Sequence, residues 1–327
     1  MAKSIYAIYH INFLKLSEQN LKLEGFTQTQ PEHYKIELEK VLSRADIPVN
    51  KLKKDGEHIP LECTKKANRD GVTMLLLNNE KNKTYQEGKD DRTLTYHPGC
   101  YIFIDNRKGA STMAIERSSS FESDPNKVRD LLEDAFNNIL KYKGMKVEIR
   151  ARLREAEFWD IVDEQCKKFN DVVRKVSFKF PNPDEVKNIP ADTPVKLTKK
   201  LIMLGSLTKE CGAAKGILHM DSDKDHVIQL KRTQKDLANM VHLCCQTGYD
   251  ISVHFRHYGL YRFGDKIRAY GMINETDIEE FKTGATIIGK TCEGTFSIIQ
   301  WFDEIKNTDN LFTDEEPSPQ RRKRKHS

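Results

Sequence analysis

The most chemically distinctive segment of this sequence is a run of arginine, histidine and tyrosine residues between positions 251 and 271. If residues 251–255 form a strand, Ile251, Val253 and Phe255 point to one face and the residues between them point outward. The basic and aromatic residues that follow the start of this strand are Arg256, His257, Tyr258, Tyr261, Arg262, Arg268 and Tyr270. Guanidinium groups neutralise phosphates, and aromatic rings stack on unpaired bases. The segment therefore predicts a surface for single-stranded RNA or DNA. The alternative is an ordinary exposed sheet face with tyrosines at its rim.

A second candidate is a set of aspartates directly after an apolar strand. Asp221 and Asp223 are candidate Mg²⁺ ligands, because hard cations prefer carboxylate oxygens. Lys231, directly after a strand expected at residues 227–230, completes the layout of a restriction-type nuclease, in which a lysine stabilises the attacking water or the phosphate. An EF-hand is excluded, since its sixth and twelfth positions are His226 and Arg232. The alternative is a polar hairpin turn.

Several other catalytic motifs are missing from the sequence. There is no GxSxG, GxGxxG or HExxH motif. Arg92 and His97 have the R-x4-H spacing of helical ribonucleases, but the residues between them favour a strand and Pro98 follows at once. We therefore predict no catalytic residue and no cofactor, except Mg²⁺ if the nuclease hypothesis holds.

Cysteine usage is typical of a reducing compartment. The seven cysteines lie at positions 63, 100, 166, 211, 244, 245 and 292. No two of them have the two-to-four-residue separation that zinc ribbons need. We expect most of them to be small core residues of a cytoplasmic protein.

The net charge of +5 comes from the C-terminus. Five of the 54 basic residues form the run 321–325, and the remainder equal the 49 acidic residues in number. The folded body is therefore formally neutral, so it can bind an anion only through a local patch. The basic run itself could bind nucleic acid, serve in targeting or only keep the terminus soluble.

The length of 327 residues suggests about two domains. No apolar run is long enough to span a membrane, and the first residues alternate instead of forming a signal-peptide core. We expect a soluble α+β protein with no membrane partner.

Hydrophobic periodicity predicts the same element order in both halves. In the first half, the order is a strand over 4–16, a helix after Pro31, a strand over 72–77, a hairpin over 99–117, a helix capped by Asp124 and a strand over 145–153; residues 79–98 are expected to be an insertion or long loop. In the second half, helices are expected over 155–169, from Pro194 to Leu207, after Thr233 and over 295–305, and strands over 173–180, 216–220, 227–230 and 251–255, followed by a hairpin at Gly264-Asp265.

This order predicts two tandem split-βαβ, or ferredoxin-like, halves. The expected domains are residues 1–153 and 154–312, followed by a disordered tail over 313–327 that is first acidic and then basic. The tandem element order resembles that of CRISPR-associated RNA-handling proteins. Their glycine-rich loop has no counterpart here, so no catalytic residue is carried over from them.

The leading hypothesis is a nucleic-acid-binding protein without a catalytic site of its own. It would suit a subunit of a bacterial multi-protein system such as phage defence. Two alternatives stay open: an interaction or scaffold subunit that forms oligomers, and the metal-dependent nuclease.

Overall fold

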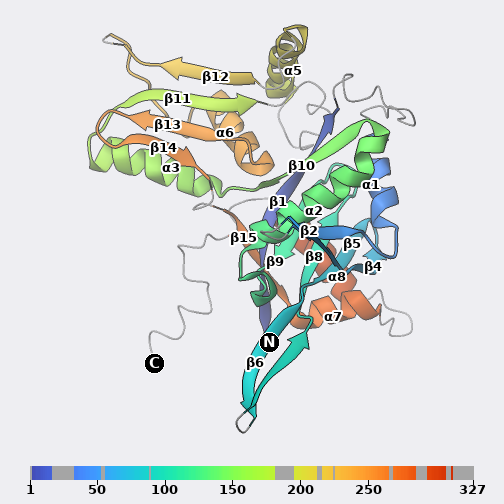
Figure 1. Cartoon of the computed structure of the whole chain (residues 1–327). Coiled ribbons are helices and arrows are strands. Elements are labelled where there is room, and N and C mark those ends of the chain that lie inside the picture. The colour runs from blue at the N-terminus through green and yellow to red at the C-terminus, as the bar shows by residue number, and fades with distance from the viewer. Residues whose placement is uncertain are drawn as a thin grey trace. The chain divides into compact units, whose positions relative to one another are not determined.

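The structure is a computed structural model with mixed α+β architecture, antiparallel strand pairs and, in the part of the chain that it describes, seven α-helices (Figure 1). The described residues are 2–16, 33–52, 56–87, 90–180, 195–211, 216–223, 225–264, 268–284, 293–306 and 311. The predicted tail over 313–327 lies outside them. None of the described helices is both long and apolar enough to cross a membrane.

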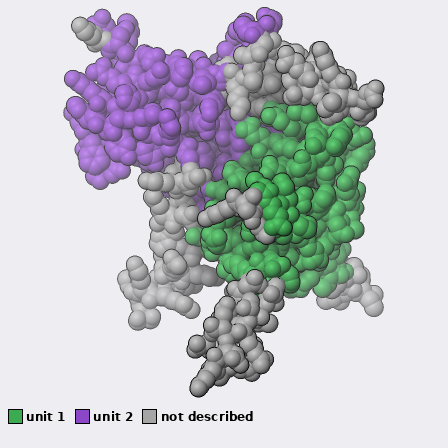
Figure 2. Space-filling view, in the orientation of Figure 1, with its two compact units in different colours: residues 1–7, 14–149, 272–302 green, residues 8–13, 150–271, 303–327 purple. Residues whose placement is uncertain are grey.

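The chain divides into two compact units (Figure 2). Unit 1 contains residues 1–7, 14–149 and 272–302, and unit 2 contains residues 8–13, 150–271 and 303–327. The domains predicted over residues 1–153 and 154–312 stay a prediction, and the chain passes from unit 1 to unit 2 at residues 149–150. The sequence did not indicate that residues 272–302 return to unit 1.

The first unit is built on a seven-stranded sheet with the order β10-β1-β9-β8-β5-β4, in which β15 also pairs with β1. Its strands are β1 (Lys3–Lys15), β4 (Cys63–Arg69), β5 (Val72–Asn78), β8 (Gly99–Asp105), β9 (Thr112–Glu116), β10 (Met145–Ala151) and β15 (Tyr270–Asn274). Two separate hairpins are β2 (Val49–Leu52) with β3 (His58–Leu61) and β6 (Lys81–Glu87) with β7 (Asp90–Tyr96). The helices are α1 (Tyr34–Leu42), α2 (Pro125–Leu140), α7 (Glu275–Thr283) and α8 (Glu293–Glu304).

Helix α2 forms as the sequence predicts. The carboxylate of Asp124 accepts a hydrogen bond from the Asn126 backbone N–H at 3.0 Å, and Pro125 occupies the first turn. Gly144 ends the following 3₁₀ turn with a φ of +67°, a conformation that glycine adopts without strain. Of the insertion or long loop expected over 79–98, the loop is wrong, because residues 81–87 and 90–96 pair as β6 and β7 in a two-stranded sheet of their own.

The second unit contains a four-stranded antiparallel sheet with the order β12-β11-β13-β14. The strands are β11 (Val173–Phe180), β12 (Gly216–Asp221), β13 (Ile251–Phe255) and β14 (Gly259–Phe263); the helices are α3 (Glu155–Asp163, continued by a π turn over Glu164–Lys168), α5 (Val195–Glu210) and α6 (Lys235–Thr247). Alternate residues of β11 and β13 are buried in one core with Phe158 of α3 and Val241 of α6. These two helices therefore cover one face of the sheet (Figure 1).

Two local predictions in this unit are wrong. The strand expected over 227–230 is reduced to a single bridge between Ile228 and Val173. Helix α6 begins one residue later than expected, with Gln234 and not Thr233 at its N-cap. The turn that follows β13 spans residues 256–258 and joins β13 to β14, whereas the hairpin expected at Gly264-Asp265 lies partly outside the described residues, since these end at Gly264 and resume at Arg268. The tandem ferredoxin-like arrangement itself stays a prediction.

Candidate nucleic-acid interface

The strand register of unit 2 determines which side chains share the sheet face opposite α3 and α6. Because Val176 and Val253 are buried in the core, their neighbours along each strand point to the other face. One row across this outer face is His219, Ser177, Ser252 and Arg262. The next row is Asp221, Lys175, His254 and Leu260. All eight side chains are exposed or half-buried. We call this surface, together with Lys179, the outer face.

The outer face carries more positive than negative charge. Lys175 lies 3.7 Å from Asp221, and Lys179 forms an ion pair with Asp250. Arg262 adds a third exposed cation. Exposed ion pairs of this kind are weak and exchange readily with other anions. The outer face can therefore present its lysines to a phosphate backbone at little cost.

The turn between β13 and β14 is held in place by Asp171. Its carboxylate accepts the backbone N–H groups of His257, at 3.0 and 3.1 Å, and of Tyr258, at 2.9 Å. It also accepts the N–H of Val172 at 2.7 Å, while Arg256 N–H donates to the Val172 carbonyl at 2.8 Å. Burial would raise the pKa of Asp171, but these three N–H bonds outweigh it and lower the pKa. The ionised carboxylate therefore fixes the backbone of the turn.

The side chains of this turn project into solvent. Arg256 and His257 are exposed, and Tyr258 is 55% exposed. The ring of Tyr258 makes an edge contact with Phe255, with centroids 6.2 Å apart, and lies 5.9 Å from the ring of Tyr261. A tyrosine that is anchored on one side and open on the other is suited to stacking on an unpaired base.

Tyr261 lies on the opposite side of the sheet from Arg262. It is paired with Val253, whose side chain is in the core, so it points to the helix-covered face. It is half-buried, and its ring lies 4.7 Å from that of Phe263. Tyr261 and Arg262 therefore lie on opposite faces of the sheet, although the sequence pattern predicts both on one binding surface.

Arg268 and Tyr270 do not belong to an accessible surface. Their exposures are 5% and 1%, and the Arg268 guanidinium lies 6.0 Å from the ring centre of Tyr9. The segment they flank pairs with the first strand, since Ile8 N–H donates to the Ala269 carbonyl at 3.0 Å. The sequence pattern predicts Arg268 and Tyr270 to be exposed nucleic-acid contacts. This expectation is wrong, because both side chains are buried.

The aspartates expected to hold Mg²⁺ serve local structure. Asp221 faces Lys175, and Asp223 accepts the backbone N–H groups of Asp225 and His226 at 2.9 and 2.6 Å. Among the described residues, no group of three His, Cys, Asp or Glu side chains is arranged to hold a metal ion. Lys231 lies in an irregular segment, because the strand that would carry it does not form.

Sequence reasoning missed the contribution of Lys175, Lys179 and His219 to this surface. The sequence of residues 173–180 already contained a signal for the two lysines, because Lys175 directly precedes the core residue Val176 and Lys179 directly follows the core residue Phe178. The Ser177 hydroxyl lies 2.7 Å from His219 Nδ1, a contact between strands that no local pattern reveals.

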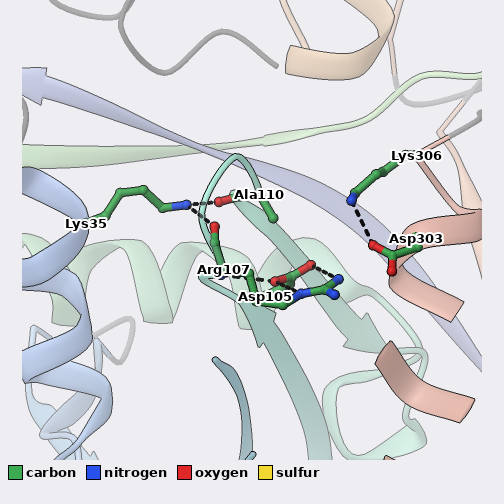
Figure 3. A network of polar contacts seen from close by, with 6 residues as sticks. All are labelled: Lys35, Asp105, Arg107, Ala110, Asp303 and Lys306. Atoms are coloured by element: carbon green, nitrogen blue, oxygen red, sulfur yellow. Dashed lines mark hydrogen bonds and ion pairs between the residues drawn. The ribbon is translucent and has the colours of Figure 1, made fainter. Parts of the chain in front are cut away.

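A second cationic turn, between β8 and β9, is occupied by internal contacts. The Arg107 guanidinium bonds the buried carboxylate of Asp105 at 2.8 and 2.9 Å, and the Lys35 ammonium donates to the carbonyls of Arg107 and Ala110 (Figure 3). The same view shows the exposed Asp303–Lys306 pair of unit 2. Arg107 is therefore a poorer candidate for phosphate binding than the 256–258 turn.

The chain matches no protein family model, no curated protein and no solved structure.

Proposed function

We propose that the protein binds single-stranded RNA or DNA across the outer face of unit 2 and the 256–258 turn, with no catalytic step. The observation that carries this proposal is the turn itself. It exposes an arginine, a histidine and a tyrosine on a backbone clamped by Asp171, at the edge of a sheet face with exposed cations.

In this proposal, Arg256 and Arg262 neutralise phosphates and Tyr258 stacks on a base. Lys175 and Lys179 supply further phosphate contacts by exchanging their aspartate partners for the nucleic acid. Single strands suit such a surface because their bases are free to reach an aromatic ring, whereas those of a duplex are stacked inside it.

Fluorescence anisotropy with labelled single-stranded and double-stranded RNA and DNA tests the proposal. Full-length protein and a version ending at Gln320 are compared, so that binding by the basic run is separated from binding by the folded body. We expect single-strand binding that weakens with salt and persists after the truncation. Binding that disappears with the truncation would contradict the proposal.

The double variant Arg256→Ala/Arg262→Ala locates the site. Each phosphate contact in a single strand contributes about 0.7 to the slope of log affinity against log salt, so the variant should flatten this slope by about 1.4. Arg44→Ala/Arg232→Ala is the matched control, because it removes two exposed arginines outside the outer face. Equal affinities for the two double variants would overturn the assignment.

The cellular setting belongs to the same proposal. The expectations of a cytoplasmic location, tandem ferredoxin-like halves and membership of a multi-protein defence system rest on element order and cysteine usage. An oligomeric scaffold subunit is the second candidate function, and it is favoured by the edge position of β12, which pairs only with β11 among the described strands.

A further inference from the structure

Strand β12 has one edge that pairs with no other strand of the described residues. In the described part of the chain it pairs with β11 and with no other strand. The backbone N–H of Ser222 donates to the Arg174 carbonyl at 2.8 Å, so residue 222 and every second residue before it direct their backbone groups toward β11. The N–H and C=O groups of Ile217, His219 and Asp221 consequently point away from the sheet.

The residues of β12 themselves give this edge none of the usual protection against strand pairing. Edge strands are normally blunted by lysine, proline or a bulge. The sequence GILHMD of β12 contains no lysine or proline, and its pairing with β11 has no break in register. Ile217, Leu218 and Met220 are 48%, 36% and 37% exposed. The opposite edge strand, β14, carries Arg262.

We propose that β12 pairs antiparallel with β12 of a second copy of this chain, forming a homodimer around a two-fold axis at His219. In this register His219 lies opposite the partner's His219, and Ile217 lies opposite the partner's Asp221. These are the residues whose backbone groups point to the free edge, so each facing pair exchanges two hydrogen bonds. Shifting the register by two residues leaves one of them without a partner residue within the strand.

The side-chain pattern of β12 is complementary to itself. Leu218 then lies opposite the partner's Met220 on the helix-covered face, and directly opposite side chains are close enough to pack. Both residues border a mostly apolar cavity of about 690 Å³ that is also lined by Leu201, Leu204 and Met240. The partner's β12 would cover the exposed side of this cavity with apolar side chains.

The distribution of charge along β12 also favours a second copy of this chain as the pairing partner. Asp221 is the only charged residue of β12, and in this register it lies opposite an isoleucine. Like charges that face each other would destabilise the pairing, and this register brings no two like charges together along β12. A two-fold axis perpendicular to the sheet keeps the outer faces of both copies on the same side. The dimer therefore joins them into one surface, although its formation does not depend on nucleic acid.

Sedimentation equilibrium of the full chain without nucleic acid tests the dimer. We expect a mass of about twice 37.8 kDa that falls on dilution. His219→Pro removes an edge N–H but none of the hydrogen bonds to β11, so it should weaken association at least about tenfold. His219→Ala keeps that N–H and should leave the dimer intact. A monomer throughout the concentration series, or equal association of both variants, would overturn the proposal.

A pair of substitutions at Ile217 tests the register. Ile217→Glu places two carboxylates opposite each other and should dissociate the dimer, whereas Ile217→Lys faces the partner's Asp221 and should preserve it. Circular dichroism and thermal unfolding show whether each variant is folded. If the lysine variant dissociates as much as the glutamate variant, the proposed register is wrong.

Discussion

The carboxylate of Asp171 holds the backbone of His257, with its two oxygens 3.0 and 3.1 Å from the His257 nitrogen. Asp171 precedes β11, and His257 lies in the turn that connects β13 with β14. A residue 86 positions away thus determines how the β13–β14 turn is presented. This contact supports the proposed binding site through the backbone, and leaves the side chains of the turn available.

Asp171→Asn should loosen this turn. The amide retains one acceptor oxygen, so at least one of the three N–H groups loses its partner, at a cost of about 1–3 kcal/mol in the free energy of unfolding. We expect faster amide hydrogen exchange at His257 and Tyr258, together with weaker nucleic-acid binding. Asp160→Asn, at an exposed position of α3, is the control. Unchanged exchange at the turn in Asp171→Asn would contradict the role of this carboxylate.

Glu155 connects α3 with α6 in a pH-dependent way. Its carboxylate lies 2.8 Å from His242 Nδ1 and accepts the indole N–H of Trp159 at 3.0 Å. Burial would raise the pKa of Glu155, but these two hydrogen bonds outweigh it and lower the pKa. Because the folded-state pKa is below the unfolded value of about 4.3, the stabilisation is present above that pH and is lost as the pH falls through the folded-state pKa.

Glu155→Gln should therefore lower stability at pH 7 by about 1–3 kcal/mol, and the difference from the wild type should shrink below about pH 4. Urea unfolding at a series of pH values measures this. Glu164→Gln, which breaks an exposed ion pair with Lys168, should change stability by less than about 1 kcal/mol. A difference for Glu155→Gln that stays constant down to pH 3 would exclude this linkage.

Local signals predicted the elements whose boundaries are set by neighbouring residues. Asp124 and Pro125 indicate the start of α2. The alternation of Ile251, Val253 and Phe255 with polar residues correctly predicts that these three side chains are buried in the core. The β6–β7 hairpin was missed because its many Asn, Lys and Asp residues are typical of loops. Its strands are stabilised by pairing with each other, which composition does not indicate.

Long-range pairing explains what the sequence could not predict about the candidate site. Arg268 and Tyr270 continue the basic and aromatic pattern of Arg256 and Tyr258, yet they are buried where the chain returns to the first strand. Nothing near residue 268 indicates that residue 8 will lie beside it. The same limitation hid the clamp by Asp171, which is adjacent to the turn only in the folded chain.

Lys35 should titrate at an unusually low pH. Burial lowers its pKa to about 8, although the nearby carboxylates of Asp105 and Glu39 oppose this effect. Carbon-13 methylation of the lysines and NMR titration should therefore show one amine with a midpoint of about 8 that rises to about 10.4 in urea. Glu39→Gln removes one opposing charge and should lower the midpoint further. A native midpoint at the unfolded value would disprove the burial of this ammonium group.

Photochemical cross-linking tests most directly whether nucleic acid binds the outer face of unit 2. The full chain is irradiated with a single-stranded oligonucleotide that carries 4-thiouridine, and the cross-linked peptides are identified by mass spectrometry. Our account predicts cross-links in the peptide that contains His257 and Tyr258, and their loss in Arg256→Ala/Arg262→Ala. Cross-links confined to unit 1 or to the basic run 321–325 would contradict it.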